Sequence, residues 1–510
     1  MPLPDDANIA RAQALHRLGD LPGARRCFEA ALAENSGQPS ILRELGVVLM
    51  ESGAVKEALA RLAEALDLDP NSRATLLAIA SAQIKAGNVA GAGEAIALAA
   101  EHPPPNRYSA WFQQAGKPVQ ETVKELTQLG NSLYASNRLA EAAEAYEAAL
   151  AASPDDATNI AHLAGVFLGE NRLALAIEGY ERALAIRPGD PWIRYCLGIA
   201  YLTAADFRRG WECFEARLDR KPLWRELSKR RWQGTPSCPP GKSMLLVAEQ
   251  GQGDVIHFIR FVPGVVALGF RVSVLASPAL KPLLAAQPWL EAVYDEKDRS
   301  PDFDEYCPLL SLPRLLADHA AAAPAPVPYL RVPADRREPA RLRLAGLPGP
   351  KIGLVWAGNP KHEKDRIRSL SLKRLIPLLP KEGASLFSLQ KQCPAADRGT
   401  LARLTQLHDL SDQLGDFAAT AAFVSQLDLL ISVDTSVAHL AGALGVPLWI
   451  LLPFAPDWRW QLDRSDSPWY PTARLYRQPA LNDWDTLLGR VAQDLAAFVR
   501  HHPDSGPAGP

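Results

Sequence analysis

Residues 139–154 read LAEAAEAYEAALAASP, and residues 173–188 read LALAIEGYERALAIRP, which is the same pattern displaced by 34 residues. In both stretches a small residue lies twelve positions before the proline, an aromatic residue eight before it and an alanine five before it. A turn residue that ends such a unit recurs along the first part of the chain, at Ser36, Pro70, Pro104, Pro154, Pro188 and Pro222. A fixed period of this length predicts an array of helical hairpins.

The intervals between these turn residues are 34, 34, 50, 34 and 34, which predicts six units over residues 1–225 with an insert at about 105–120. Small residues let two helices approach closely, and the larger residue fills the space between neighbouring hairpins. The pattern resembles the tetratricopeptide repeat, whose Leu-Gly pair also occurs at Leu45-Gly46, Leu129-Gly130 and Leu197-Gly198. An ordinary helical bundle is the alternative, but a bundle has no reason to keep a fixed offset.

Composition limits the remaining possibilities. A chain of 510 residues is too long for one hydrophobic core and suggests about three domains. Its 55 Lys and Arg balance its 57 Asp and Glu, so nothing indicates a nucleic-acid binder or a binder of acidic membranes. The six cysteines are scattered without a C-x-x-C pair, which is typical of reduced thiols. We expect neither a secretion signal nor a membrane span, and therefore a cytoplasmic protein.

The pattern changes between Lys221 and Lys242, where a basic, tryptophan-containing segment ends in glycine and proline turn residues. Beyond it, short apolar runs alternate with amphipathic stretches, which favours parallel sheets joined by crossover helices. We predict two Rossmann-like lobes, residues 226–335 and 336–510, and interpret 320–350 as the linker. The expected strands are 244–248, 271–275, 292–294, 352–356, 385–389, 427–433 and 447–452.

Lobes of this kind bind ligands at the carboxyl ends of their strands, so the loops there form the candidate site. The loop after the first strand reads EQGQGDVIH from Glu249 to His257. Its glycines permit a tight turn into a helix, and Gln250, Gly253 and Asp254 are candidate site residues. An ordinary helix N-cap explains Asp254 as well, and a lone G-x-G is a weak signal for a nucleotide.

A second loop gathers basic side chains beyond a strand end, namely Lys361, His362, Lys364, Arg366 and Arg368. Guanidinium groups suit phosphate because they present a fork of donors that keeps its charge at neutral pH. Interspersed acidic residues leave a solvated charged loop as the alternative. The candidate donor-binding residues are Asn359, Arg366 and Arg368, and Gln390, at the end of the next strand, is either a nucleotide contact or a surface residue.

A third loop carries the strongest signal. An apolar strand is followed by DTSVAHLAGALG from Asp434 to Gly445, a helix of small residues. The free N–H groups and the positive dipole end of that helix, beside the hydroxyls of Thr435 and Ser436, make an anion site that needs no metal. His439 lies one turn into the helix, where it either faces the same ligand or only packs.

Together these loops resemble the two-lobed, heptosyltransferase type of glycosyltransferase, which is the GT-B fold of family 9. Gly253-Asp254, followed by Val-Ile-His, matches the family's motif after its first strand. Asp434, Thr435 and His439 match its Asp-Thr-x-x-x-His, and Arg368 replaces its usual phosphate-binding lysine. With the repeats in front, the chain resembles bacterial tetratricopeptide-repeat glycosyltransferases, some of which modify flagellin or other proteins.

The resemblance implies an inverting, metal-independent transfer from a nucleotide-sugar co-substrate to a protein that the repeats bind, with no separate cofactor. Asp254 is then the general base, and Arg368 and the helix that begins near Asp434 stabilise the departing phosphate. Asp302-Phe303-Asp304 looks like the metal-binding D-x-D of other glycosyltransferases, but no further carboxylate converges on it. Two alternatives stay open: a repeat scaffold with a degenerate transferase half, and a heptosyltransferase acting on a glycolipid core.

Overall fold

The computed structural model describes residues 4–17, 20–34, 37–70, 72–86, 88, 95, 119–219, 230–234, 241–299, 301–317, 326–362 and 364–502. The chain divides into two compact units, the first ending at Thr122 and the second beginning at Val123. The division falls inside the predicted repeat array, and the predicted domain limits stay a prediction. The predicted insert and the turn residues Ser36, Pro104 and Pro222 lie outside the described residues.

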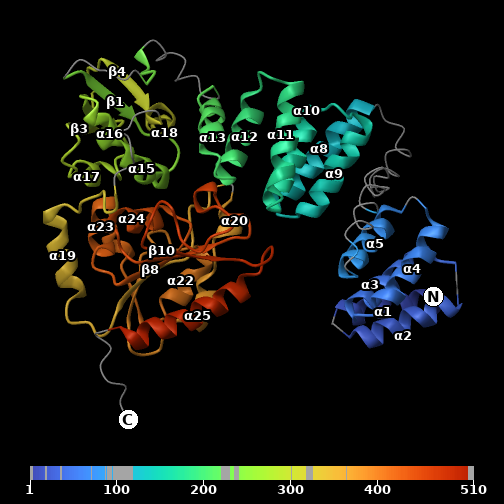
Figure 1. Ribbon diagram of the computed structural model, residues 1–510. Coiled ribbons are helices and arrows are strands. Elements are labelled where there is room, and N and C mark those ends of the chain that lie inside the picture. Colours follow the sequence, from blue (N-terminus) through green and yellow to red (C-terminus); the bar gives the residue numbers. More distant parts are fainter. Residues whose placement is uncertain are drawn as a thin grey trace. The chain divides into compact units, whose positions relative to one another are not determined.

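In the described residues of the first unit, consecutive helices pack on each other. They are α1 (Pro4–Arg17), α2 (Leu21–Glu34), α3 (Pro39–Glu51), α4 (Val55–Leu68) and α5 (Arg73–Lys85) (Figure 1). The large residues of the repeat pattern fill the spaces between them, since Phe28 and Leu62 are fully buried. A side chain at Gly46 would lie 2.6 Å from Leu62. The glycine of the Leu-Gly pair therefore lets α3 and α4 approach closely.

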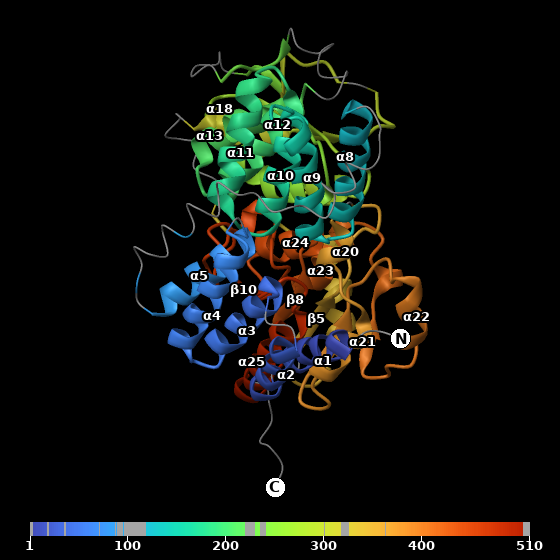
Figure 2. The same ribbon diagram turned by 90° about the vertical axis from the view of Figure 1, so that its right-hand side faces the viewer.

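The second unit begins with three further hairpins, which Figures 1 and 2 show side by side: α8 (Val119–Ala135) with α9 (Leu139–Ala152), α10 (Ala157–Gly169) with α11 (Leu173–Ile186), and α12 (Pro191–Thr203) with α13 (Phe207–Phe214). Asp156 and Asp190 cap two helices 34 residues apart, each accepting two backbone N–H bonds. The turns inside the hairpins place Asn137, Asn171 and Ala205 at φ values of 57°, 60° and 60°. The period of the sequence is thus a period of the backbone.

The N-terminal lobe contains a parallel sheet with the strand order β3-β2-β1-β4. Its strands are β1 (Ser243–Val247), β2 (Arg271–Leu275), β3 (Ala292–Tyr294) and β4 (Glu305–Pro308). Its helices include α15 (Gln252–Phe258), α16 (Val262–Ala267), α17 (Lys281–Leu284) and α18 (Leu312–Leu316). Because β2 and β4 lie on opposite sides of β1, the strand order reverses beside β1.

The C-terminal lobe contains a parallel sheet with the strand order β10-β9-β8-β5-β6-β7. Its strands are β5 (Lys351–Val355), β6 (Ser385–Ser388), β7 (Leu407–Asp409), β8 (Leu429–Val433), β9 (Leu448–Leu452) and β10 (Ala473–Arg477). Its helices include α20 (Asp365–Arg368), α21 (Leu372–Leu375), α22 (Ala395–Leu401), α23 (Phe417–Val424), α24 (Ser436–Leu444) and α25 (Trp484–His501). Here the strand order reverses between β5 and β8.

The predicted fold class, an α-solenoid of repeats followed by two α/β lobes with parallel sheets, is confirmed. All seven predicted strands are present with ends displaced by two residues or fewer, whereas β7 and β10 were not expected as strands. The segment 320–350, interpreted as the linker between the lobes, contains a helix, α19 (Ala334–Leu344), which packs on α23. Among the helices of the described ranges, none is both long and apolar enough to cross a membrane.

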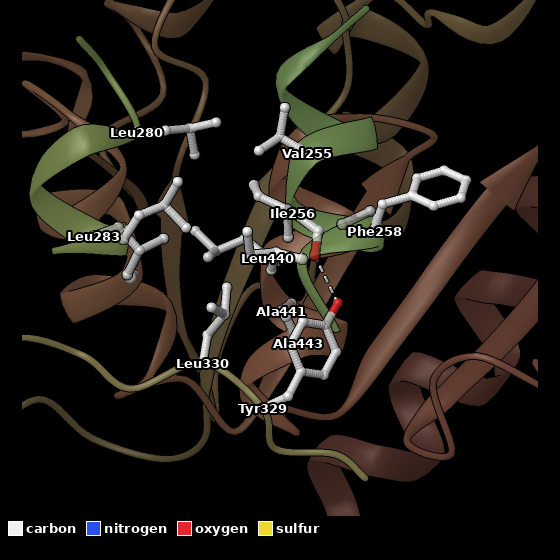
Figure 3. Packing of buried hydrophobic residues seen from close by; sticks show 14 of the residues in the cluster. Val255, Ile256, Phe258, Leu280, Leu283, Tyr329, Leu330, Leu440, Ala441 and Ala443 are labelled. Carbon is white, nitrogen blue, oxygen red and sulfur yellow. Dashed lines mark hydrogen bonds between the residues drawn. The ribbon is translucent and has the colours of Figure 1, made fainter. Parts of the chain in front are cut away.

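One apolar core continues from the N-terminal lobe into the C-terminal lobe (Figure 3). Val255 and Ile256 of α15 and Leu440 of α24 belong to it, together with Tyr329, whose hydroxyl donates to the Ile256 carbonyl at 2.9 Å. The last repeat joins the same core through Trp211, which meets the ring of Trp458 edge-on at 5.2 Å. The lobes and the last repeat are therefore held together by apolar packing.

Candidate active site

The three predicted loops leave from strands that flank the two reversals of strand order. In the C-terminal lobe the loops follow β5 and β8, and in the N-terminal lobe the loop follows β1. In open parallel sheets such reversals are where ligands bind, because the loops on either side diverge. The helices that begin at two of these loops, α15 and α24, pack directly on each other. The fold therefore brings the predicted loops of both lobes to one place.

The start of α24 has the geometry of an anion site. Thr435 is the N-cap, in extended backbone with φ −139° and ψ 169°, and its side chain makes no capping hydrogen bond. Its hydroxyl lies 3.1 Å from that of Ser432 instead. The first-turn N–H groups, which begin at the half-buried Ser436, thus have no side-chain cap within the helix and suit an anionic ligand.

Asp254 occupies the third position of α15 and faces both lobes. Its Oδ2 accepts the N–H of Gly251, the N-cap residue, at 2.9 Å, and its Oδ1 accepts from Nη2 of Arg459 at 2.5 Å. The N-cap alternative is wrong in detail, because Gly251 is the N-cap and Asp254 reaches back to it. Burial raises the pKa of Asp254, and the Arg459 guanidinium opposes that shift.

Arg459 was not among the predicted site residues. It is buried, with its guanidinium 2.5 Å from Asp254, 2.8 Å from Oδ1 of Asp457 and 4.3 Å from the centre of the Trp458 ring. Asp254 precedes it by 205 residues, so no local pattern connects the two. The sequence feature that could have indicated Arg459 is its position between two tryptophans, because a cation held by aromatic faces is suited to a buried position.

Arg368 lies near Asp434 in the C-terminal lobe. Its Nε is 3.3 Å from Oδ1 of Asp365, and a side chain at Gly358 would come within 2.7 Å of its Nη2. Burial and the neighbouring Asp457 raise the pKa of Asp434, and the positive charge of Arg368 works against this rise. Arg368 thus places a cation near Asp434, and its contact with the donor stays a prediction.

His439 is buried against α15. A side chain at Gly253 would come within 2.8 Å of its ring, which makes the glycine of the Gly-Asp pair a packing requirement. The His439 ring stacks on Trp460 at 5.3 Å, and its Nε2 lies 3.7 Å from Oδ1 of Asp434. Burial, with the charge of Arg459, lowers the pKa of His439 to about 3, so the imidazole is neutral at pH 7.

The loop after β1 is fastened to the last repeat. Nη2 of Arg217, directly after α13, lies 2.7 Å from Oε1 of Glu249, and both side chains are almost fully buried. The next residue, Gln250, is exposed and has a left-handed φ of 62°. An exposed side chain at this position is free to meet a ligand, and the contact of Gln250 with the donor stays a prediction.

Two other predicted contacts are not supported. Gln390 is buried, its Oε1 accepts from the N–H groups of Trp356 and Ala357, and its Nε2 donates to the carbonyls of Ala357 and Gln392. Neither a nucleotide contact nor a surface position fits an amide that is already fully bonded. Arg366 donates to the carbonyl of Ala135 at the end of α8, where the negative end of the helix dipole attracts a cation.

The exposed Asn359 has a local role, since its side-chain oxygen accepts from the N–H of Lys361 at 3.0 Å. In the D-x-D segment, Asp304 has a structural role, because its Oδ2 accepts from the N–H and the hydroxyl of Ser243 at the start of β1, both at 2.8 Å. In the described part of the chain, no group of three or more His, Cys, Asp or Glu side chains is placed to hold a metal ion.

Comparison with family models identifies the helical hairpins. Residues 9–73 and 127–191 match one model of the tetratricopeptide repeat, and residues 49–110 match a second. The first part of the chain therefore carries tetratricopeptide repeats, as the 34-residue period predicted.

Among curated proteins, the chain is 30% identical over 324 residues to Protein FlbA of Caulobacter vibrioides. The match covers 57% of this chain and 52% of FlbA, so the chain spans about half the length of that relative. Among solved structures, a family 9 glycosyl transferase from Veillonella parvula matches 52% of this chain and 99% of its own, with a TM-score of 0.39 and 11% identity. ADP-heptose LPS heptosyltransferase II of E. coli matches 51% and 98%, with a TM-score of 0.35 and 16% identity.

Proposed function

We propose that this chain is a glycosyltransferase that moves a sugar from a nucleotide-sugar to a protein acceptor, without a metal and with inversion at the anomeric carbon. One observation carries the proposal: the strand-order reversals of both lobes meet at the contact of α15 with α24. This arrangement sets a carboxylate of one lobe against the uncapped helix start of the other. A base and an anion site on facing lobes are the two groups that transfer from a sugar phosphate requires.

The donor's phosphates would bind at the start of α24. The first-turn N–H groups, the hydroxyls of Thr435 and Ser436 and the guanidinium of Arg368 supply donors there. Negative charge grows on the leaving phosphate as the glycosidic bond breaks, so fixed donors stabilise the transition state more than the ground state. These fixed groups supply the charge stabilisation that a bound metal ion provides in other enzymes.

Asp254 would accept the proton from the acceptor hydroxyl. In the structure, Arg459 holds one oxygen of this carboxylate at 2.5 Å. A diphosphate carries more charge than a carboxylate, so we expect a bound donor to draw Arg459 away from Asp254. That exchange would leave Asp254 free to act only when the donor is present.

The tetratricopeptide repeats would bind the acceptor, because a row of helical hairpins offers an extended surface suited to a polypeptide. The last repeat packs against the lobes through Trp211, and Arg217 fixes the loop that leads to Asp254. A protein bound there would lie close to the candidate base. Flagellin is the acceptor that the sequence resemblance suggests, and the alternative is an adaptor protein.

A thermal-shift screen with ADP-, CMP-, UDP-, GDP- and dTDP-linked sugars tests the proposal. A ligand at about 100 times its Kd stabilises the protein by about 2.7 kcal/mol, which raises the melting temperature measurably. The responding donor should stabilise Arg368→Ala markedly less than the wild type, whereas Arg366→Ala, whose side chain turns toward α8, should respond as the wild type does. A wild type that responds to none of these donors would favour the scaffold alternative.

A further inference from the structure

The hydroxyl of Tyr470 lies between two buried imidazoles. It is 3.0 Å from Nδ1 of His257 on α15 and 2.9 Å from Nδ1 of His439 on α24. Tyr470 and His257 are fully buried and His439 is 6% exposed, so water does not compete for these bonds. The three side chains join the two lobes directly behind the candidate anion site.

The fold makes room for this arrangement. A side chain at Gly442, one turn after His439, would lie 2.4 Å from the Tyr470 ring. On the far side, Arg260 donates to the carbonyls of His257 and Trp469 and to the hydroxyl of Tyr329. Its guanidinium also lies 4.8 Å from the centre of the Tyr470 ring. The phenol is thus held from both sides and cannot turn away from the two imidazoles.

The available donors and acceptors determine the direction of the two hydrogen bonds of Tyr470. A tyrosine hydroxyl has one proton and an oxygen that can accept, so Tyr470 can donate to at most one of the two imidazoles. Nε2 of His257 is buried and has no hydrogen-bond partner in the described part of the chain. A buried N–H without an acceptor is costly, so His257 is best protonated at Nδ1, where Tyr470 accepts. Tyr470 then donates to Nδ1 of His439.

The surroundings of His439 lead to the same tautomer. Its Nε2 faces Oδ1 of Asp434 at 3.7 Å, and a carboxylate favours a protonated nitrogen on that side over a bare lone pair. Burial lowers the pKa values of both histidines, so each carries a single ring proton at pH 7. The hydrogen bond from Tyr470 and the carboxylate of Asp434 therefore favour the same tautomer of His439, the one protonated at Nε2.

We propose that Tyr470, with His257 behind it, is a positioning residue that holds His439 in the tautomer protonated at Nε2, the nitrogen that faces Asp434 and the start of α24. His439 then presents an N–H donor to a bound phosphate without needing a positive charge. The assigned tautomer does not depend on any ligand, whereas its use in catalysis rests on the proposed function.

Nuclear magnetic resonance on the full chain, labelled with ¹⁵N in its ten histidines, tests this assignment at pH 7.5. Long-range ¹H–¹⁵N spectra distinguish protonated from bare ring nitrogens, and His257→Gln and His439→Gln assign the signals by their loss. We expect His439 protonated at Nε2 and His257 protonated at Nδ1. A wild-type spectrum with His439 protonated at Nδ1 overturns the proposal, whatever the donor screen shows.

A matched pair of variants tests the role of Tyr470 itself. Tyr470→Phe should displace the His439 Nδ1 signal, because its hydrogen bond is lost. Tyr476→Phe removes a different tyrosine hydroxyl of the same lobe, which donates to Asp494 at 2.9 Å, and should leave the His439 signals in place. Equal effects of the two variants, or none from Tyr470→Phe, would refute the positioning role. A wild-type tautomer with no response to any nucleotide-sugar would instead count against the proposed function alone.

Discussion

Replacing Asp254 by asparagine is the sharpest test of the candidate site. Asparagine has almost the same shape, but it cannot take a proton from an acceptor hydroxyl. The sequence alone predicts that the change is nearly neutral for stability, because asparagine also serves at helix starts. The structure changes this expectation, since one oxygen of Asp254 binds the N–H of Gly251 and the other binds Arg459.

The magnitude follows from these two bonds. An asparagine oxygen can replace only one of them, and its amide group would then face either the Gly251 N–H or the Arg459 guanidinium, both of which are donors. A hydrogen bond to a charged group is worth about 1.5–3 kcal/mol, and we expect a destabilisation of that size. Turnover should fall by about 10² or more if Asp254 is the general base.

The assay pairs single-turnover transfer from the responding nucleotide-sugar with urea unfolding. Asp457→Asn is the matched control, because it removes the other carboxylate that binds Arg459, at 2.8 Å. Both variants should lose similar stability, but only Asp254→Asn should lose transfer, while Asp457→Asn stays within about tenfold of the wild type. An Asp254→Asn protein with near-normal transfer would refute the assignment of the base.

Three further expectations follow. Arg368→Ala should weaken donor binding about 10- to 100-fold in isothermal titration, because a charge-assisted phosphate contact worth about 1.5–3 kcal/mol is lost; unchanged affinity would remove Arg368 from the site. The pKa of His439 is about 3 in the folded chain and about 6.5 when unfolded, so stability falls as the pH drops below 6.5. Between pH 7.5 and 5.5, His439 should lower the free energy of unfolding by about 1.4 kcal/mol. The free energy of unfolding of His439→Gln, measured by urea unfolding at both pH values, should therefore fall by about 1.4 kcal/mol less than that of the wild type. Gln390→Leu should lower the melting temperature, because two buried backbone N–H groups lose their acceptor, and an unchanged melting temperature would contradict the bonding seen here.

The repeats, the two sheets and the three loops could be predicted from sequence because each is recorded in a local pattern. A 34-residue period states which residues face a neighbouring hairpin, and an apolar run states where a parallel strand is buried. The loop that follows such a run lies at the carboxyl end of the strand, so Asp254, Arg368 and Asp434 could be assigned to that edge of the sheets before their surroundings were known.

Only the tertiary structure decided which side chains meet. Arg459 reaches Asp254 over 205 residues, and Tyr470 reaches His257 over 213, because α15 packs on α24. Two predicted residues bind other groups: Gln390 bonds backbone groups of neighbouring loops, and Arg366 bonds the carbonyl at the end of a repeat helix. Local patterns fix which way a side chain faces within its element, but hydrogen-bond and ion-pair partners depend on how separate elements pack, which no short stretch of sequence contains.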